Sequence, residues 1–206
     1  RVESSAASDV YKRQHMKIGI VSDIHCNLAG LLKAVELMGD VDELLCLGDV
    51  IYDYRFSNEV VGWLRENQVP TVLGNHEWGF LGPQGSRARA SANVDQDLVG
   101  WLADQPYRLD LTRAGKRLLL VHSTPWEPYG DYVLPGSLEL RRFANEGADV
   151  VMYGHTHQQT AEWIGDTLVI NPGSAGDARD NRNGRKLSCA ILDLSQGEVQ
   201  IIDYIV

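Results

Sequence analysis

The sequence predicts an α/β fold in which two packed mixed β-sheets are flanked by helices, an α/β/β/α sandwich. In the first half of the chain, short β-branched stretches alternate with segments of helical periodicity. The second half consists mostly of strand patterns separated by turn residues, which suits two sheets packed face to face. The 206 residues, of which 44% are hydrophobic and 23% charged, are enough for one globular domain with such a core.

The first half is expected to alternate strands with helices. Asn27 and Ser57 are good N-caps, and apolar residues recur at helical spacing after each of them. Gly39 is placed to end the first helix, and Pro70 prevents any continuation of the second. The expected strands are residues 17–21, 43–47 and 71–73, and the expected helices are residues 28–38 and 58–67.

The second half is expected to begin with a loop and then to be rich in strands. Residues 78–91 contain many Gly, Arg and Ser residues, which favours a surface loop over the functional site. Turn pairs at Ala114-Gly115, Gly165-Asp166 and Gln196-Gly197 separate neighbouring strands. The expected strands are residues 108–111, 116–121, 150–153, 159–164, 167–170, 187–193 and 199–204, and the expected helices are residues 92–104 and 137–145.

Composition excludes several classes of function. The formal net charge of -9 argues against a protein that binds nucleic-acid polymers, since such proteins carry a basic face. A small anionic substrate is compatible with this charge, because bound divalent cations can reverse the local field. No apolar run approaches the ~20 residues needed to span a membrane. Cys26, Cys46 and Cys189 are far apart and odd in number, which favours reduced thiols and a cytoplasmic protein.

Residues 1–15 are predicted to be a disordered leader that is foreign to the fold. They show no hydrophobic periodicity and resemble a translated sequencing adapter. They end just before Met16, where the first strand pattern begins. A genuine disordered tail is the alternative. The fold is therefore expected to occupy residues 16–206 as a single domain.

Side chains that can bind metals gather where the predicted strands end. Asp23 and His25 follow the first strand, and residues two apart on an extended backbone point the same way. Later strand ends offer Asp49, Asn75, His76, His122, His155 and His157. Every histidine except His15 lies at such an end, and α/β sheets bind ligands beyond the carboxyl ends of their strands. Since carboxylates and imidazoles suit divalent transition metals, the sequence predicts a metal site built from these loops.

Taken singly, most of these residues have a structural alternative. Asp23 can cap the following helix, and Asp49 or Asn75 can be a turn residue beside its glycine. His122 at a strand end is more often a hydrogen-bonded core histidine than a ligand. The recurrence of such residues after successive strands favours the metal site over these separate explanations.

Taken together, the motifs resemble those of the calcineurin-like metallophosphoesterases. They are Asp23-x-His25, Gly48-Asp49, Gly74-Asn75-His76-Glu77, His122 and Gly154-His155-x-His157. Two further stretches, Ser57-Asn58-Glu59-Val60 and Asn171-Pro172-Gly173-Ser174, are similar to the small single-domain phosphodiesterases of prokaryotes. The resemblance covers almost all of residues 16–206.

The resemblance implies a hydrolase with a dinuclear metal centre. Asp23, His25 and His157 would bind the first ion, Asn75, His122 and His155 the second, and Asp49 would bridge them. Manganese is the expected metal, with iron, zinc, cobalt and nickel as alternatives. A metal-bound hydroxide would attack a small phosphodiester, and His76 would be the general acid for the leaving group.

The chain departs from the Ser/Thr protein phosphatases of the superfamily. Those enzymes carry an aspartate three residues after the Gly-Asp aspartate, where this chain has Tyr52. The residue that would orient His76 is therefore left open, and protein phosphatase activity is not expected. The alternatives are a nucleotide phosphomonoesterase or dinucleoside polyphosphate hydrolase, and, in another class, an interaction scaffold of the same fold such as a retromer subunit.

Loop residues are expected to select the substrate, which is a small phosphorylated molecule. Arginines can meet extra phosphates, and aromatic rings can stack on a base. The candidates are Arg55, Arg87, Arg89, Arg179, Arg182, Arg185, Trp78, Trp126, Tyr129 and Tyr132. Whether the protein is a monomer or a homodimer is left open.

Overall fold

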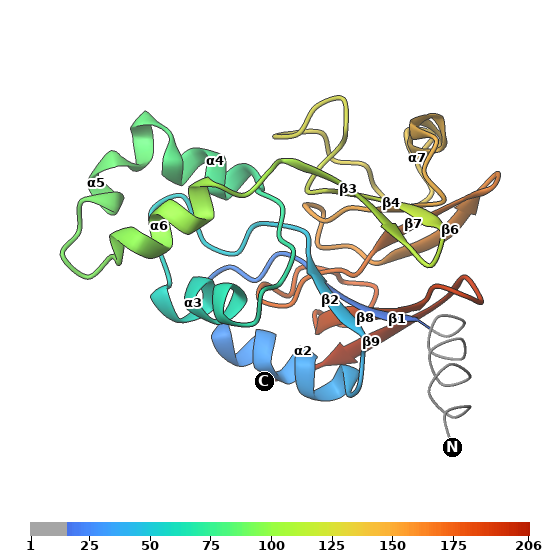
Figure 1. Ribbon diagram of the computed structural model, residues 1–206, viewed down its shortest axis with the longest axis horizontal. Helices are drawn as coiled ribbons and strands as arrows, with labels where there is room; N and C mark the ends of the chain where they lie inside the picture. Colours follow the sequence, from blue (N-terminus) through green and yellow to red (C-terminus); the bar gives the residue numbers. More distant parts are fainter. Residues whose placement is uncertain (1–15) are drawn as a thin grey trace, which may run out of the picture.

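Two β-sheets packed face to face form the centre of the molecule, with helices on both outer sides (Figure 1). The structure is a computed structural model that describes residues 16–206. The α/β/β/α sandwich expected from the sequence is confirmed. The expectation of a foreign leader over residues 1–15 concerns a part of the chain outside the described residues.

The first sheet has the strand order β2–β1–β8–β9. Its strands are β1 (Lys17–Val21), β2 (Glu43–Cys46), β8 (Leu187–Asp193) and β9 (Glu198–Tyr204). The sheet is mixed, because β1 is parallel to β2 and antiparallel to β8. The strand expected at residues 71–73 is reduced to one bridge between Thr71 and Cys46, since the next N–H on the β2 side, that of Gly74, donates to Glu77 Oε2 instead of to the sheet.

The second sheet has the strand order β3–β4–β5–β7–β6. Its strands are β3 (Arg108–Arg113), β4 (Lys116–Val121), β5 (Val150–Met152), β6 (Thr160–Ile164) and β7 (Thr167–Asn171). The three central strands are parallel, and the two edge strands are antiparallel to their neighbours. The carboxyl ends of β4 and β5 therefore lie at the same edge of the sheet.

The apolar core follows the alternation of side chains along the strands. Ile20, Leu120 and Met152 face inward and are buried between the two sheets. Leu119 and Val151, each one residue away, face the opposite side and pack under the helical segment α7 (Leu140–Phe143) and its 3-10 extension η2 (Ala144–Glu146). On the other outer face, α2 (Leu28–Met38) and α3 (Asn58–Glu66) cover the first sheet, and α6 (Gln96–Ala103) packs on α3.

Sequence signals account for the ends of these helices. The side chain of Asn27 accepts a hydrogen bond from Gly30 N, and that of Ser57 accepts one from Val60 N, so α2 and α3 begin where expected. α6 begins later than the expected residue 92, because Asp95 is its N-cap. The last helix is shorter than the expected 137–145 and spans only the four residues of α7.

The expectation of a loop over residues 78–91 is wrong, because this stretch is mostly helical. It contains most of α4 (Asn75–Leu81), the 3-10 turn η1 (Pro83–Gly85) and α5 (Ser86–Arg89). Glycines weaken the helical pattern of this stretch in the sequence, and at least one of them leaves space for a neighbouring side chain. A Cβ on Gly79 would lie 2.6 Å from Asp53 Oδ1, so glycine lets this carboxylate approach α4.

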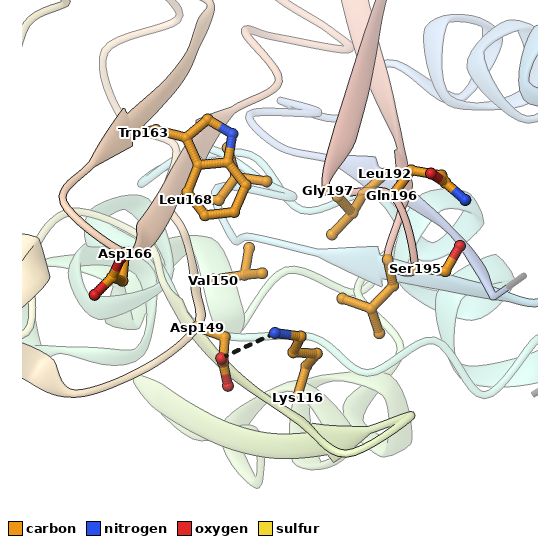
Figure 2. Close-up of a pocket in the computed structure, with 11 residues that line it drawn as sticks. Lys116, Asp149, Val150, Trp163, Asp166, Leu168, Leu192, Ser195, Gln196 and Gly197 are labelled. Carbon is orange, nitrogen blue, oxygen red and sulfur yellow. Dashed lines mark hydrogen bonds and ion pairs between the residues drawn. The ribbon is translucent and has the colours of Figure 1, made fainter. Parts of the chain in front are cut away.

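A hollow of about 170 Å³ opens between the sheets at the amino-terminal ends of their parallel strands (Figure 2). Val150, Leu168 and Leu192 form apolar walls, and Lys116 pairs with Asp149 at 3.3 Å on its rim. The predicted metal site lies at the carboxyl ends, so this hollow is remote from it. Among the described residues, no helix is both long and apolar enough to cross a membrane.

Candidate metal centre

The candidate ligands lie in loops at the carboxyl ends of parallel strands from both sheets. Asp23 and His25 follow β1, Asp49 follows β2, and His122 follows β4. His155 and His157 follow β5, while Asn75 and His76 begin α4. The structure brings all eight side chains into one continuous group, joined by the contacts described below.

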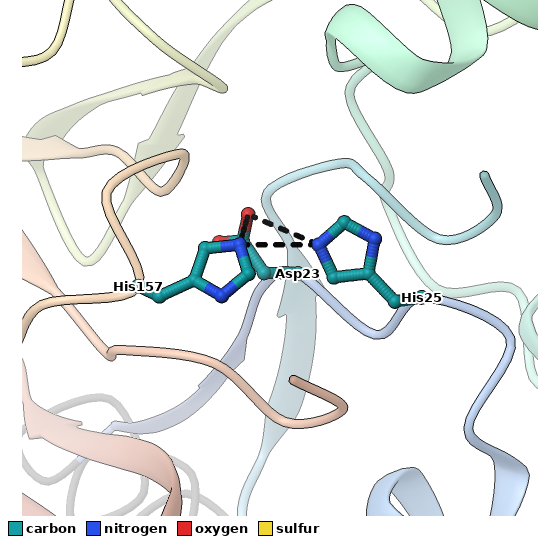
Figure 3. Close-up of side chains that lie close together, drawn as sticks. All are labelled: Asp23, His25 and His157. Carbon is teal, nitrogen blue, oxygen red and sulfur yellow. Dashed lines mark hydrogen bonds and ion pairs between the residues drawn. The ribbon is translucent and has the colours of Figure 1, made fainter. Parts of the chain in front are cut away.

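The first cluster consists of Asp23, His25 and His157, whose ligand atoms all lie within 4.8 Å of one another (Figure 3). His157 Nε2 is 3.2 Å from Asp23 Oδ1 and 3.1 Å from His25 Nε2. His25 Nε2 is 3.9 Å from the same carboxylate oxygen. All three residues are buried, and the three atoms face one point.

The second cluster consists of Asp49, His122 and His155, which meet the same 4.8 Å limit. His122 Nε2 is 3.0 Å from Asp49 Oδ2 and 3.2 Å from Asn75 Oδ1. The rings of His122 and His155 meet edge to face, with centroids 5.1 Å apart. One carboxylate, two imidazoles and an amide oxygen therefore converge here.

Asp49 lies between the two clusters. It forms a third group with His25 and His76, whose ligand atoms are again within 4.8 Å of one another. The first cluster also approaches the second directly, because Asp23 Oδ1 is 3.9 Å from His122 Nε2. The two clusters are thus adjacent, and the Asp49 carboxylate faces both.

Several buried polar atoms at this place have no hydrogen-bond partner. Asp23 Oδ1 and His155 Nε2 are two of them. His25 Nε2 and His157 Nε2 also face each other at 3.1 Å, a contact that is favourable only while one of the two nitrogens carries a proton. Buried polar atoms in proteins are nearly always satisfied, and a cation bound here would satisfy all of these together. The residues present therefore fit a group of divalent ions.

The backbone of the loops adopts a conformation that most residues avoid. Asp23, His25, Asp49, His155 and His157 all have positive φ, between 48° and 64°. For a residue with a Cβ this left-handed conformation costs about 1–2 kcal/mol. The extended backbone expected for Asp23 and His25 is therefore wrong, and a tight left-handed turn aims these side chains inward instead. Concentrated strain of this kind is typical of functional sites.

Hydrogen bonds behind the clusters fix the orientation of the rings. His122 Nδ1 donates to Leu47 O at 2.7 Å, and His157 Nδ1 donates to Asp177 O at 2.8 Å. Because a carbonyl oxygen can only accept, each ring carries its proton on Nδ1 and presents Nε2 to the cluster. Asp23 Oδ2 is held by the Ser22 hydroxyl at 2.6 Å, which leaves Oδ1 for the centre.

Glu77 ties the surrounding loops together, a role that the sequence reasoning missed. Its buried carboxylate accepts hydrogen bonds from Asp49 N at 2.8 Å, Gly74 N at 2.8 Å and Ile51 N at 3.1 Å. Burial and the negative charge of Asp49 raise the pKa of Glu77 to about 7. An acidic residue three positions after a helix-capping glycine was the available signal.

Burial and the negative charges of the two aspartates shift the pKa values of the four clustered histidines in two opposite directions. Burial lowers the pKa of His25 and His155 to about 4, so both are neutral at pH 7. Burial acts in the same direction on His122, but the negative charge of Asp49 outweighs it and raises the pKa to about 10. His157 likewise has a raised pKa because of Asp23. Without bound cations, the centre thus attracts positive charge in the form of protons.

His76 stands at the rim of the centre and is held by Asp53. Its Nδ1 is 2.8 Å from Asp53 Oδ1, and its Nε2 is 3.9 Å from Asp49 Oδ2. The side chain is 23% exposed, so it can reach both the centre and a bound substrate. Asp53 is the orienting residue that the sequence left open. It lies four residues after Asp49, next to the position occupied by Tyr52.

Other residues named in advance have structural roles or lie apart from the centre. The Cys26 thiol is buried and donates to Arg55 O at 3.3 Å. Trp126 packs against Phe143 with the guanidinium of Arg142 over its ring, so it belongs to the α7 core. Trp78, on α4, is 49% exposed and packs against another aromatic ring instead of against the histidines.

Comparison with known proteins agrees with this geometry. A family profile described as the calcineurin-like phosphoesterase superfamily domain matches residues 16–197. The chain is 29% identical over 163 residues to phosphodiesterase MJ0936 of Methanocaldococcus jannaschii, covering 77% of this chain and 83% of that protein. It is 28% identical over 180 residues to phosphodiesterase YfcE of Escherichia coli K12, covering 86% and 88%.

Solved structures give the same result for the fold. The crystal structure of a metallophosphoesterase from Sphaerobacter thermophilus is similar with a TM-score of 0.75 and 23% sequence identity, over 93% of this chain and 88% of that one. The profile match covers most of the chain and includes every candidate ligand. The chain therefore belongs to the calcineurin-like phosphoesterase superfamily, and its family makes it a phosphoric ester hydrolase.

Proposed function

We propose that the protein is a metal-dependent phosphodiesterase that hydrolyses small phosphodiesters at a dinuclear centre. The observation that carries this proposal is the position of Asp49, whose carboxylate faces two adjacent clusters of buried ligand atoms. A carboxylate between two such clusters can bridge two ions, whereas a single ion would need only one cluster.

In this proposal each ion has its own set of ligands. Asp23, His25 and His157 would hold one ion, Asn75, His122 and His155 would hold the other, and Asp49 would be shared. Oxygen and imidazole ligands without thiolates suit manganese, which we take as the working metal, and also suit iron, zinc, cobalt and nickel. The neutral His25 and His155 can bind an ion directly, while His122, whose pKa is raised to about 10, must first lose a proton.

The chain's own residues prepare the reaction. When bound, two such ions neutralise phosphoryl oxygens and lower the pKa of a water molecule so that it can act as a nucleophile. Asp53 accepts the Nδ1 proton of His76, which turns Nε2 toward Asp49 and the space above the centre. From that position His76 Nε2 donates a proton to the alkoxide that leaves, as a general acid. Glu77 holds the backbone around Asp49 in place while this happens.

The alternatives are less well supported. A scaffold of the same fold would not need His76, its Asp53 partner or a complete set of ligand side chains, and all of them are present. The net charge of -9 disfavours binding of a nucleic-acid polymer. We place the enzyme in a reducing compartment, the cytoplasm, because its three cysteines are buried and free.

Metal-dependent hydrolysis tests the proposal. The protein is stripped of metal and assayed with bis(p-nitrophenyl) phosphate and with p-nitrophenyl phosphate, with and without Mn²⁺. Diester hydrolysis is expected only with the ion, and His76→Asn is expected to lower kcat by ~10²-fold or more, the usual value of general acid catalysis.

A variant outside the centre serves as the control. Gln84→Ala changes an exposed side chain in the turn after α4, so its kcat should stay within about twofold of the unmodified protein. Preferential hydrolysis of the monoester would favour the phosphomonoesterase. Binding of the ions without hydrolysis of either ester would favour the scaffold.

A further inference from the structure

We propose that Arg179 is a specificity-determining residue, which binds a second anionic group of the substrate beside the phosphoryl group that is hydrolysed. This inference rests on the proposed function, because it concerns the same site. Within the small phosphodiesters, it names the class of substrate: those that carry a second phosphate next to the phosphoryl group that is hydrolysed.

The segment that carries Arg179 is fixed to the metal centre by hydrogen bonds. Ser174 Oγ donates to Asp23 O at 2.8 Å and accepts from Asp177 N at 2.8 Å. Asp177 O in turn accepts the Nδ1 proton of His157 at 2.8 Å. The backbone next to Arg179 is therefore tied to residues of both strand ends that form the first cluster.

Asp177 contacts both the guanidinium of Arg179 and the His157 ring. Arg179 Nη2 is 2.6 Å from Asp177 Oδ2, on the same residue whose carbonyl holds that ring. The charge of Arg179 acts on His157, Tyr52 and Tyr132, all of which border the centre. From these contacts we infer that the guanidinium lies beside the first cluster.

Two aromatic rings pack on histidines of the two clusters. Tyr52 stacks on His25 with ring centroids 4.6 Å apart, and Tyr132 packs on His155 at 4.0 Å. Tyr132 is 64% exposed, so its outer face is open to a ligand. A ring on each cluster, together with the Arg179 guanidinium, suits a molecule that extends beyond the ions.

Arg179 has free capacity to bind an anion. A guanidinium has five N–H donors, and the contact with Asp177 Oδ2 uses the Nη2 end. The side chain is 59% exposed, so its remaining donors are accessible. A planar guanidinium can bind a phosphate through two parallel hydrogen bonds, which an ammonium cannot.

Other arginines near this segment have different partners. Arg182 is bound to both oxygens of Asp180 and to Gln159 O. Arg185 donates to Asn181 within its own turn. On the far side of the site, Arg89 binds the carbonyl oxygens at the end of α4. Each of these guanidinium groups stabilises a loop, whereas Arg179 pairs with the residue whose carbonyl holds the His157 ring.

Binding of AMP and ADP to the Mn²⁺-loaded protein tests the inference without depending on turnover. The two nucleotides differ by one phosphate, so the ratio of their dissociation constants measures what the second anionic group contributes. Hydrogen bonds to charged groups predict that ADP binds about 10- to 100-fold tighter than AMP. In Arg179→Gln the ratio should fall to about one, and Arg179→Lys should give an intermediate value.

Arg185→Gln is the matched control, because it removes the same charge from an exposed arginine six positions away. The ratio of dissociation constants should be the same in this variant as in the unmodified protein. Because the nucleotides bind Mn²⁺ in solution equally in both samples, the comparison also corrects for that effect. A ratio near one in the unmodified protein, or an unchanged ratio in Arg179→Gln, would overturn the inference. Failure of the proposed function would look different, since the diester would then not be hydrolysed whatever the nucleotides bind.

Discussion

Replacing Gly74 with alanine tests whether the position of Asp49 depends on the absence of a side chain at residue 74. A Cβ at this position would lie 2.7 Å from Asp49 N and 2.9 Å from Asp49 Cγ, and closer still to Oδ1. Real Cβ atoms essentially never approach other atoms so closely. The φ of Gly74 is -103°, which alanine adopts easily, so the contact and not the backbone conformation is what the substitution perturbs.

The surroundings leave Asp49 little room to move. Its N–H is bound to Glu77 Oε2 at 2.8 Å, and its Oδ1 accepts from His76 N at 3.0 Å. Overpacking of this kind costs about 1–3 kcal/mol, which for a chain of this size corresponds to a fall in Tm of roughly 2–12 °C. Because the displaced group is the proposed bridge, Gly74→Ala should also bind fewer than two Mn²⁺ ions per chain.

Thermal unfolding of the metal-free protein and metal analysis after dialysis against Mn²⁺ measure both effects. Gly100→Ala is the control, since nothing lies within 4 Å of a Cβ at this exposed position in α6. It should raise the stability by about 0.5–1 kcal/mol and leave the metal content unchanged. If Gly74→Ala has an unchanged Tm and binds both ions, the packing argument for Asp49 is refuted.

Two further predictions concern protons. Asp53→Asn should lower kcat about 10- to 100-fold, a smaller loss than that caused by replacing His76, and should leave the metal content unchanged. The control is Asp166→Asn in the distant β6–β7 turn, which should have no effect on kcat. Equal activity of the two variants would show that Asp53 has no part in the mechanism. Since His122 has a pKa of about 10 in the metal-free protein, Mn²⁺ binding at pH 7.5 should release at least one proton and become tighter as the pH rises toward 10. Calorimetry in two buffers with different ionisation enthalpies counts these protons, and a count of zero would contradict the charge assigned to His122.

The strand-end pattern predicted which side chains come together, but not how. The i, i+2 spacing of Asp23 and His25 suggested an extended backbone, whereas both residues have left-handed φ values. Such conformations depend on contacts from other loops, for example the hydrogen bond from His25 N to Asp49 O, and these are not visible in local spacing. Metal binding by the gathered side chains stays a prediction.

The residues around the clusters were the harder part to predict. Asp53 was not predicted as the residue that orients His76, because the hydrogen bond between the two side chains spans 23 positions in the sequence. Glu77 was noticed as part of a motif without its role, since its three backbone partners come from two different loops. Residues 78–81 of α4 were expected to lie in a loop because the stretch 78–91 is rich in Gly, Arg and Ser, and the space that Gly79 leaves for Asp53 is a tertiary effect.

The most direct test of the dinuclear centre is a crystal structure of the Mn²⁺-loaded protein with anomalous scattering recorded at the manganese edge. We predict two peaks about 3.5–4 Å apart. One should be bound by Asp23, His25 and His157, the other by Asn75, His122 and His155, and Asp49 should contact both. A single peak, or two peaks without Asp49 between them, would contradict the account.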